Sequence, residues 1–263
     1  MKITVLSENT SLSDDIDAEH GLSLWIETEK HKIIYDMGQS DVFIKNANVL
    51  GVDLSQADMA VISHGHYDHG GGLEHFLEVN SKADIYISRR AFGDYYNGSE
   101  KYIGLDKALA DCDRLIFTDD KLEIDDELSL CSFNDAELDY PVEPFGLNKK
   151  EAGHFYADDF LHEQYLVINE NGRKTVISGC SHKGILNIVK LSAPDVFVGG
   201  FHFMKLDPFS ADREKLSEIA EEMLEYKTEY YTCHCTGTEQ FEYLRVIMGN
   251  RVRYISGGAI IEI

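Results

Sequence analysis

The chain has 263 residues, of which 47 are acidic and 24 are Lys or Arg, so its formal net charge is −23. A surface of that sign repels a polyanionic backbone, and we expect no nucleic-acid partner. Hydrophobic residues make up 43% of the chain, which is enough for a sizeable core. Because no apolar run reaches the length of a membrane span, we also expect no membrane association.

Five cysteines, an odd number, are spread along the chain. The chain opens directly with a strand pattern at residues 2–6 and shows no secretory signal. These two features argue against disulfides and predict a location in the reducing cytoplasm. The thiols are then available as metal ligands.

The first half of the chain predicts strands and helices in alternation. The apolar run Met59-Ala60-Val61-Ile62 is typical of a buried strand that ends at Ser63. The strands expected in this half lie at 2–6, 22–28, 31–35, 58–62 and 83–88, and the helices at 41–50 and from Leu73 onward.

The second half repeats this arrangement. Residues 165–168 and 174–177 flank Asn171-Gly172, a strong signal for a β-hairpin. Later elements are expected as a helix at 184–191, a strand at 195–199, a helix within 211–227, a strand at 229–232, a helix at 239–248 and a strand pair within 252–263. Periodicity supports an α/β or α+β fold. The repeated alternation argues for two mixed sheets face to face, with helices on the outer faces.

The segment 89–160 has little strand pattern and many aromatic residues. Long irregular segments in compact enzymes often form lids or pocket walls, and plain packing of a subdomain is the alternative. Arg89 and Arg90 follow the strand at 83–88 as the one paired basic site near the expected mouth. Arg89 is therefore predicted either to bind a phosphate or carboxylate of the substrate, or to pair with a surplus acid.

The most informative run is His64-Gly65-His66-Tyr67-Asp68-His69, which follows the buried strand and precedes three glycines. At a strand end, His64 and His66 can face one way, and the following turn brings Asp68 and His69 toward the same space. Imidazole and carboxylate ligands suit zinc, manganese or iron, and pairs of such ions commonly serve hydrolysis. This run predicts a metal site.

The HxHxDH run after a strand resembles the metal signature of the metallo-β-lactamase fold. Tyr35-Asp36-Met37-Gly38 resembles the upstream strand whose Asp supports that site. Four more segments resemble the branch named for a dihydropterin (ribofuranosyl-aminobenzene phosphate) synthase, and they lie at 18–23, 178–182, 198–202 and 232–237. The resemblance implies one domain over residues 1–263. It implies an αββα sandwich with the site at one edge, where loops from both halves meet.

The resemblance also implies further ligands. The family places a His before a hairpin, an Asp or Cys at the end of its second strand and a final His after a later strand. These positions project onto His162, Cys180 and His234, with His182 as the alternative to His162. Inert packing is the alternative for Cys180, and a thiolate there would favour zinc over manganese. The predicted ligands are His64, His66, Asp68, His69, His162, Cys180 and His234.

The remaining polar residues are expected around the metals. Asp36 would orient a ligand His through its ring N–H. Asp68 would steer a proton, and His182 or His202 would protonate a leaving group. His20 and His202 are expected to face the substrate. A separate zinc at Cys233-His234-Cys235 is disfavoured, because neighbouring side chains of the triplet point apart in an extended chain and no second Cys pair exists.

The sequence therefore predicts an enzyme with two divalent ions, zinc favoured and manganese or iron as alternatives. The expected reaction is hydrolysis of a small ester or phosphoryl substrate by a metal-bound hydroxide. One alternative is a condensing synthase that joins a dihydropterin diphosphate to an aminobenzene ribofuranosyl phosphate. The other is a non-catalytic metal-containing ligand sensor. The partner is a small molecule, phosphorylated or pterin-like.

Overall fold

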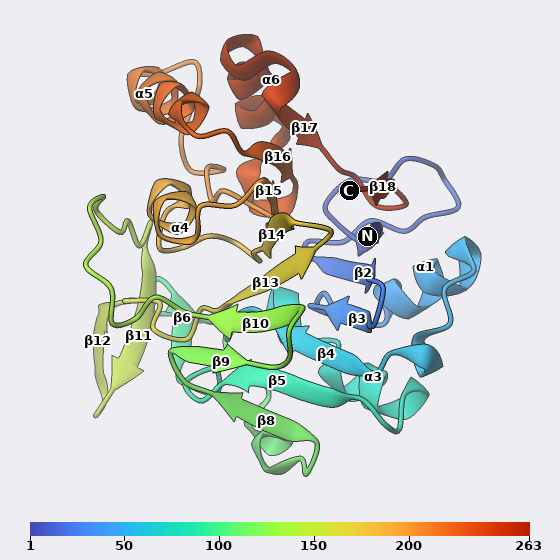
Figure 1. Ribbon diagram of the computed structural model, residues 1–263. Helices are drawn as coiled ribbons and strands as arrows, with labels where there is room; N and C mark the ends of the chain where they lie inside the picture. The colour runs from blue at the N-terminus through green and yellow to red at the C-terminus, as the bar shows by residue number, and fades with distance from the viewer.

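The computed structural model describes residues 1–263 and contains two seven-stranded mixed sheets (Figure 1). The first sheet has the strand order β18 (Ile260–Glu262), β1 (Lys2–Ser7), β2 (Ser23–Glu27), β3 (Lys32–Tyr35), β4 (Met59–Ile62), β5 (Asp84–Ser88) and β8 (Leu115–Thr118). The second has the order β17 (Val252–Tyr254), β16 (Glu229–Thr232), β15 (Val196–Val198), β14 (Arg173–Ile177), β13 (Tyr165–Glu170), β10 (Leu128–Cys131) and β9 (Lys121–Glu123).

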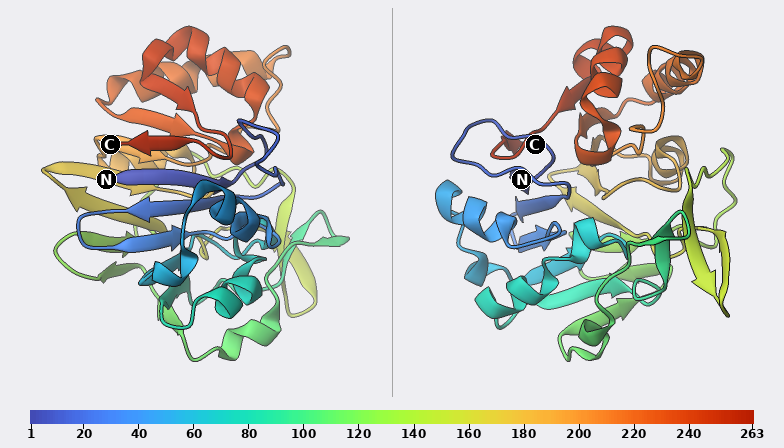
Figure 2. Two further views of the ribbon diagram at one scale, coloured as in Figure 1. Left: turned by 90° about the vertical axis from the view of Figure 1, so that its right-hand side faces the viewer. Right: turned by 180° about the vertical axis from the view of Figure 1, so that it is seen from behind.

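Helices cover the outer face of each sheet. On the first sheet lie α1 (Val42–Leu50) and α3 (Leu73–Val79), and on the second lie α4 (Ile185–Ser192), α5 (Asp212–Glu225) and α6 (Thr238–Met248). Seen from behind, the helices of the two halves lie on different sides of the sheets (Figure 2). The predicted sandwich of two sheets between helices is confirmed.

Strand β4 shows why the core has three parts. Met59 and Val61 pack into the cluster between the two sheets, while Ala60 and Ile62 pack into the cluster beneath α1 and α3. A strand covered on both faces needs apolar side chains at every position, which is why its sequence does not alternate. A third cluster fills the space between the second sheet and its helices.

The segment 89–160 is not one inserted unit. Strands β8, β9 and β10 belong to the two main sheets, so only part of the segment is separate. That part is a small third sheet at one edge of the molecule (Figure 1), with the order β12 (His154–Ala157), β11 (Leu147–Glu151), β6 (Tyr95–Asn97) and β7 (Lys101–Tyr102).

The hairpin and the chain ends give a second comparison with the sequence. Asn171 and Gly172 both have positive φ, as a tight β13–β14 turn requires. The two strands expected within 252–263 are present, but they do not pair with each other. Strand β17 pairs with β16, and β18 pairs with β1 in the other sheet. The two termini therefore lie side by side (Figure 2). No helix has the length and apolar character needed to cross a membrane.

Candidate metal centre

The candidate site is built at the carboxyl ends of strands from both sheets. Asp36 follows β3, His64 and His66 follow β4, and His234 follows β16. The one-turn helix α2 (Tyr67–Gly70) starts directly after His66. A side chain at Gly65 would place its Cβ 2.2 Å from the carbonyl oxygen of Ala91, so only glycine allows the loop between the two histidines to pack this closely against Ala91.

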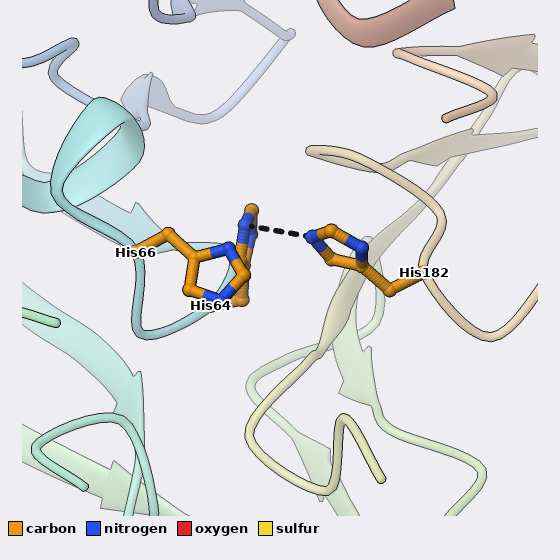
Figure 3. A group of neighbouring side chains, drawn as sticks. All are labelled: His64, His66 and His182. Carbon is orange, nitrogen blue, oxygen red and sulfur yellow. Dashed lines mark hydrogen bonds between the residues drawn. The ribbon is translucent and has the colours of Figure 1, made fainter. Parts of the chain in front are cut away.

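His64, His66 and His182 form the first group of possible ligands (Figure 3). Their ligand atoms lie within 4.8 Å of one another, and His64 Nε2 is 3.3 Å from His182 Nε2. His182 comes from the turn that follows β14, so the group joins the two sheets. Nε2 of His66 is buried without a hydrogen-bond partner. Such an atom is costly to bury unless something else binds it.

Asp68, His69 and His234 form the second group. Nε2 of His69 lies 3.2 Å from Nε2 of His234, and Asp68 Oδ2 lies 3.8 Å and 3.4 Å from these two atoms. Sγ of Cys180 is 3.1 Å from His69 Nε2 and belongs to one cluster with His64 and His69. Cys180 therefore lies between the two groups.

The hydrogen bonds behind these histidines orient their free nitrogens. His69 Nδ1 donates to Asp36 Oδ2 at 2.6 Å, and His234 Nδ1 donates to Asn9 Oδ1 at 2.7 Å. Ser63 Oγ donates to the same oxygen of Asp36, which leaves Ser63 Oγ to accept the proton of His64 Nδ1. With each Nδ1 protonated, the Nε2 lone pairs point at one another. Converging lone pairs repel unless a cation lies between them, so these residues fit divalent metal ions.

The protonation states of His64, His182 and Asp68 suit metal binding. His69 differs, because burial lowers its pKa but Asp36 and Asp68 outweigh burial and raise the pKa above its usual value. Burial and neighbouring imidazoles lower the pKa of His64 and His182 well below the usual value, so both rings are neutral. Burial raises the pKa of Asp68, but His69, His20 and His234 outweigh it, and the pKa lies well below the usual range. Neutral imidazoles and an ionised carboxylate are the forms that ligate metals.

The structure places His162 in a separate group with His66 and Asp158, outside the two ligand groups described above. Gly65 N–H donates to His162 Nδ1 at 2.9 Å, and His162 Nε2 donates to Asp158 Oδ2 at 3.2 Å. In this tautomer one ring nitrogen accepts and the other is protonated, so neither offers a lone pair to the first ligand group. The geometry favours the alternative, His182.

The three residues predicted to contact substrate lie in different places, with Arg89 outside the cleft and His20 and His202 in its wall. Arg89 is exposed and pairs with Asp119 at 3.2 Å, away from the two ligand groups. Arg89 is not among the residues that line the cleft beside the ligand groups, so the structure favours the alternative pairing with a surplus acid. Its contact with substrate stays a prediction. His20 and His202 both line the cleft, and His20 Nε2 lies 3.2 Å from Asp68 Oδ2. Burial lowers the pKa of His202 to about 3.

The ligand groups open into a cleft of about 290 Å³. Its walls come from both main sheets and from the third sheet, which contributes Asn97 and Lys101. Lys205 is a second cation at the cleft. Sequence reasoning missed both lysines, because each is isolated in the chain and becomes part of the site only through folding.

Sequence reasoning also missed Asn9, Glu8 and Glu163. Glu8 accepts the His234 N–H at 2.6 Å, and Glu163 accepts the His182 N–H at 2.7 Å. Both carboxylates are buried and fix the backbone of a candidate ligand. No motif marks them, since their partners are distant in sequence.

Three comparisons agree with this geometry. The family model of the metallo-beta-lactamase superfamily matches residues 16–233. A solved structure, Tm1679, described as a metal-dependent hydrolase of the beta-lactamase superfamily, is 30% identical with a TM-score of 0.85, and the match covers 100% of this chain and 99% of that one.

Two relatives come from Methanocaldococcus jannaschii. One, an uncharacterized protein, is 29% identical over 246 residues, 89% of this chain and 90% of its own. The other is named 7,8-dihydropterin-6-methyl-4-(beta-D-ribofuranosyl)-aminobenzene-5'-phosphate synthase and is 27% identical over 263 residues, 90% of this chain and 88% of its own. Because the family model spans most of the chain and the sandwich carries the expected histidines, the chain belongs to the metallo-beta-lactamase superfamily.

Proposed function

We propose that the protein is a metal-dependent hydrolase of a small ester or phosphoryl substrate and uses two divalent ions, with zinc favoured. The observation that carries this proposal is the convergence of His64, His66 and His182 on one point and of Asp68, His69 and His234 on a neighbouring point. These six residues offer six ligand atoms, more than the four coordination positions of one tetrahedral ion. Bound ions would supply Lewis acidity and lower the pKa of a coordinated water.

The surrounding residues would bind and orient the substrate. Lys101 and Lys205 place two cations at the cleft of a chain whose net charge is −23. This local reversal of sign favours an anionic substrate, as a phosphoryl compound is. His202 packs edge-on against His182 with ring centroids 4.3 Å apart and lines the cleft, so it can donate a hydrogen bond to a bound molecule.

Proton handling is assigned to Asp68 and His20. Asp68 is ionised, and its Oδ2 lies 3.2 Å from Nε2 of the half-exposed His20. The Asn9 side-chain amide donates to His20 Nδ1 at 3.3 Å, so the ring proton is on Nε2 and His20 donates it to Asp68 Oδ2. His20 would thereby orient the carboxylate that steers a proton near the ions. A positioned carboxylate of this kind is suited to general acid and base work.

The second candidate is a condensing synthase of the dihydropterin type. The similarity to the synthase of Methanocaldococcus jannaschii covers most of both chains and favours it. In that reaction the ions would bind a departing diphosphate, and Lys101 and Lys205 would bind a phosphate of the substrate. The same fold carries many chemistries, so only the reaction itself separates the two candidates.

The test is turnover by metal-loaded protein. We expect hydrolysis of at least one member of a panel of phosphomonoesters, phosphodiesters, thioesters and lactones, with loss of activity in His66→Ala. The panel is run beside a mixture of dihydropterin diphosphate and aminobenzene ribofuranosyl phosphate, with products identified by mass. A condensed product without hydrolysis selects the synthase. Complete inactivity of protein that holds two ions contradicts both enzymes and selects a ligand sensor.

A further inference from the structure

Two thiols meet beside the second ligand group. Sγ of Cys180, Sγ of Cys235 and a ring nitrogen of His234 lie within 4.8 Å of one another, and all three residues are buried. Cys180 Sγ is also 3.1 Å from His69 Nε2. The second group is therefore richer in sulfur than the ligands predicted from the sequence.

The backbone turns Cys235 toward the cleft. Cys233 is extended and packs into the core between the sheets, while His234 has a φ of 50° and begins a short 3-10 helix at His234–Thr236. This turn sends His234 and Cys235 to the cleft wall together. Cys233 therefore does not share a metal with them, which agrees with the expectation that the triplet forms no separate zinc site.

Gly200 provides the room for the Cys235 thiol. A side chain there would place its Cβ 2.3 Å from Cys235 Sγ. The one hydrogen bond that the thiol makes is long, 3.5 Å to the carbonyl oxygen of Cys180. Because Gly200 leaves room beside it and its one hydrogen bond is weak, the Cys235 thiol is free to bind a metal ion.

Plain packing explains these two residues poorly. Buried cysteines that act as small hydrophobes lie among apolar side chains, as Cys233 does in the core between the sheets. Cys180 and Cys235 instead line the cleft beside His234 and Asp68. Their surroundings are imidazoles and a carboxylate, which are the usual neighbours of a thiolate ligand.

We propose that Cys180 and Cys235 bind the ion of the second group together with His234, whose ring nitrogen lies within 4.8 Å of both thiols. Asp68 or His69 takes the fourth position of this two-thiolate site, which suits zinc. The inference rests on the proposed metal centre but concerns only its second position. Each thiol would lose its proton to solvent when the ion binds. Thiolate ligands select zinc or cadmium over manganese or magnesium, so this pair would set the metal preference of the enzyme.

The test uses cobalt as the probe, because cobalt(II) bound to thiolate absorbs in the near ultraviolet by charge transfer. We expect a strong band in wild-type protein loaded with cobalt, a loss of about half of it in C235S and in C180S, and its disappearance in the double variant. C112S is the matched control, since Cys112 lies outside the site, and it should keep the full band. The cobalt content is measured in each sample.

A second measurement needs no variant. X-ray absorption at the zinc edge of the wild-type protein should contain a sulfur shell at about 2.3 Å beside the nitrogen and oxygen shell at about 2.0–2.1 Å. Cobalt or zinc bound without a sulfur signal, or a signal unchanged in C235S, overturns this inference alone. Protein that binds neither metal overturns the proposed metal centre as well.

Discussion

Asp36 Oδ2 lies 2.6 Å from Nδ1 of His69, and both side chains are fully buried. The same carboxylate accepts the Ser63 N–H through Oδ1 and the Ser63 hydroxyl through Oδ2, each at 2.7 Å. Asp36 therefore fixes the start of the histidine loop and the ring of His69 at once. Because Nδ1 of His69 is used in this way, Nε2 is left to face His234 and Cys180.

Replacing Asp36 with Asn should weaken binding of the second ion through His69 and also disturb that of the first through Ser63, which orients His64. The amide would present an N–H where the carboxylate now accepts, so the ring of His69 would lose its orientation. Replacing a residue that orients a metal ligand typically lowers metal affinity by about 10- to 100-fold. Competition with a chromophoric chelator measures the two affinities. Asp119→Asn, an exposed site, is the control. Equal affinity for the second ion in Asp36→Asn and wild type would contradict the assignment.

The protein should bind close to two metal ions per chain. His182→Ala should hold about one ion fewer, because His182 completes the first group. His162→Ala should keep both ions, since both nitrogens of His162 bond to other parts of the protein. Elemental analysis after growth with zinc, manganese and iron checks the counts. Less than half an ion in the wild type, or the reverse order of the two variants, would disprove the assignment.

His66→Ala should abolish turnover and leave the fold intact. His66 lies on a loop at the edge of the sandwich and belongs to none of the three apolar clusters. Circular dichroism and the thermal midpoint should therefore change little. His75→Ala, at a half-exposed position on α3, serves as the control and should be fully active. A variant that keeps more than about a tenth of the activity, a barrier change under about 1.4 kcal/mol, would remove His66 from the site.

The parts of this molecule that the sequence predicts are those encoded locally. The buried run at Met59–Ile62, the turn at Asn171-Gly172 and the histidine loop each carry their own pattern, and the structure places each as expected. The distinction between His162 and His182 is different, because it depends on what each ring nitrogen contacts across the fold. The third sheet is likewise hidden, since its short strands do not alternate clearly between polar and apolar residues.

Cys180→Asp should bind metal with a preference moved toward manganese. Carboxylate is a harder ligand than thiolate, and the position lies between the two ligand groups. Cys180→Ser should instead lose part of its affinity for the second ion, because a neutral hydroxyl is a weak ligand. Zinc and manganese are allowed to compete under reducing conditions, and the bound metals are counted. Identical preference and occupancy in wild type and both variants would show that Cys180 only packs.

A pH-dependent contribution to stability is expected from His31, away from the metal centre. Nε2 of His31 lies 2.7 Å from Asp125 Oδ2, and Nδ1 lies 3.4 Å from Asp58 Oδ1. Partial burial lowers the pKa of His31, but Asp125 and Asp58 outweigh it, so the pKa in the folded protein is raised above 6.5. A raised pKa means that the stabilisation is complete below the unfolded value of about 6.5 and is lost as pH rises through the folded value.

The matched variants are His31→Gln and His75→Gln, compared by urea unfolding at pH 5.5 and pH 9. Solvent screens the ion pairs of His31, so we expect His31→Gln to lower the free energy of unfolding by about 0.5–1 kcal/mol at the lower pH and by close to nothing at the higher one. Other groups titrate equally in both proteins and cancel in the difference from wild type. His75→Gln should show a smaller difference between the two pH values, because the half-exposed His75 makes one long ion pair, to Glu78 at 3.9 Å. A loss in His31→Gln that is the same at both pH values would mean that packing, and not the charge of the imidazolium, makes the contribution.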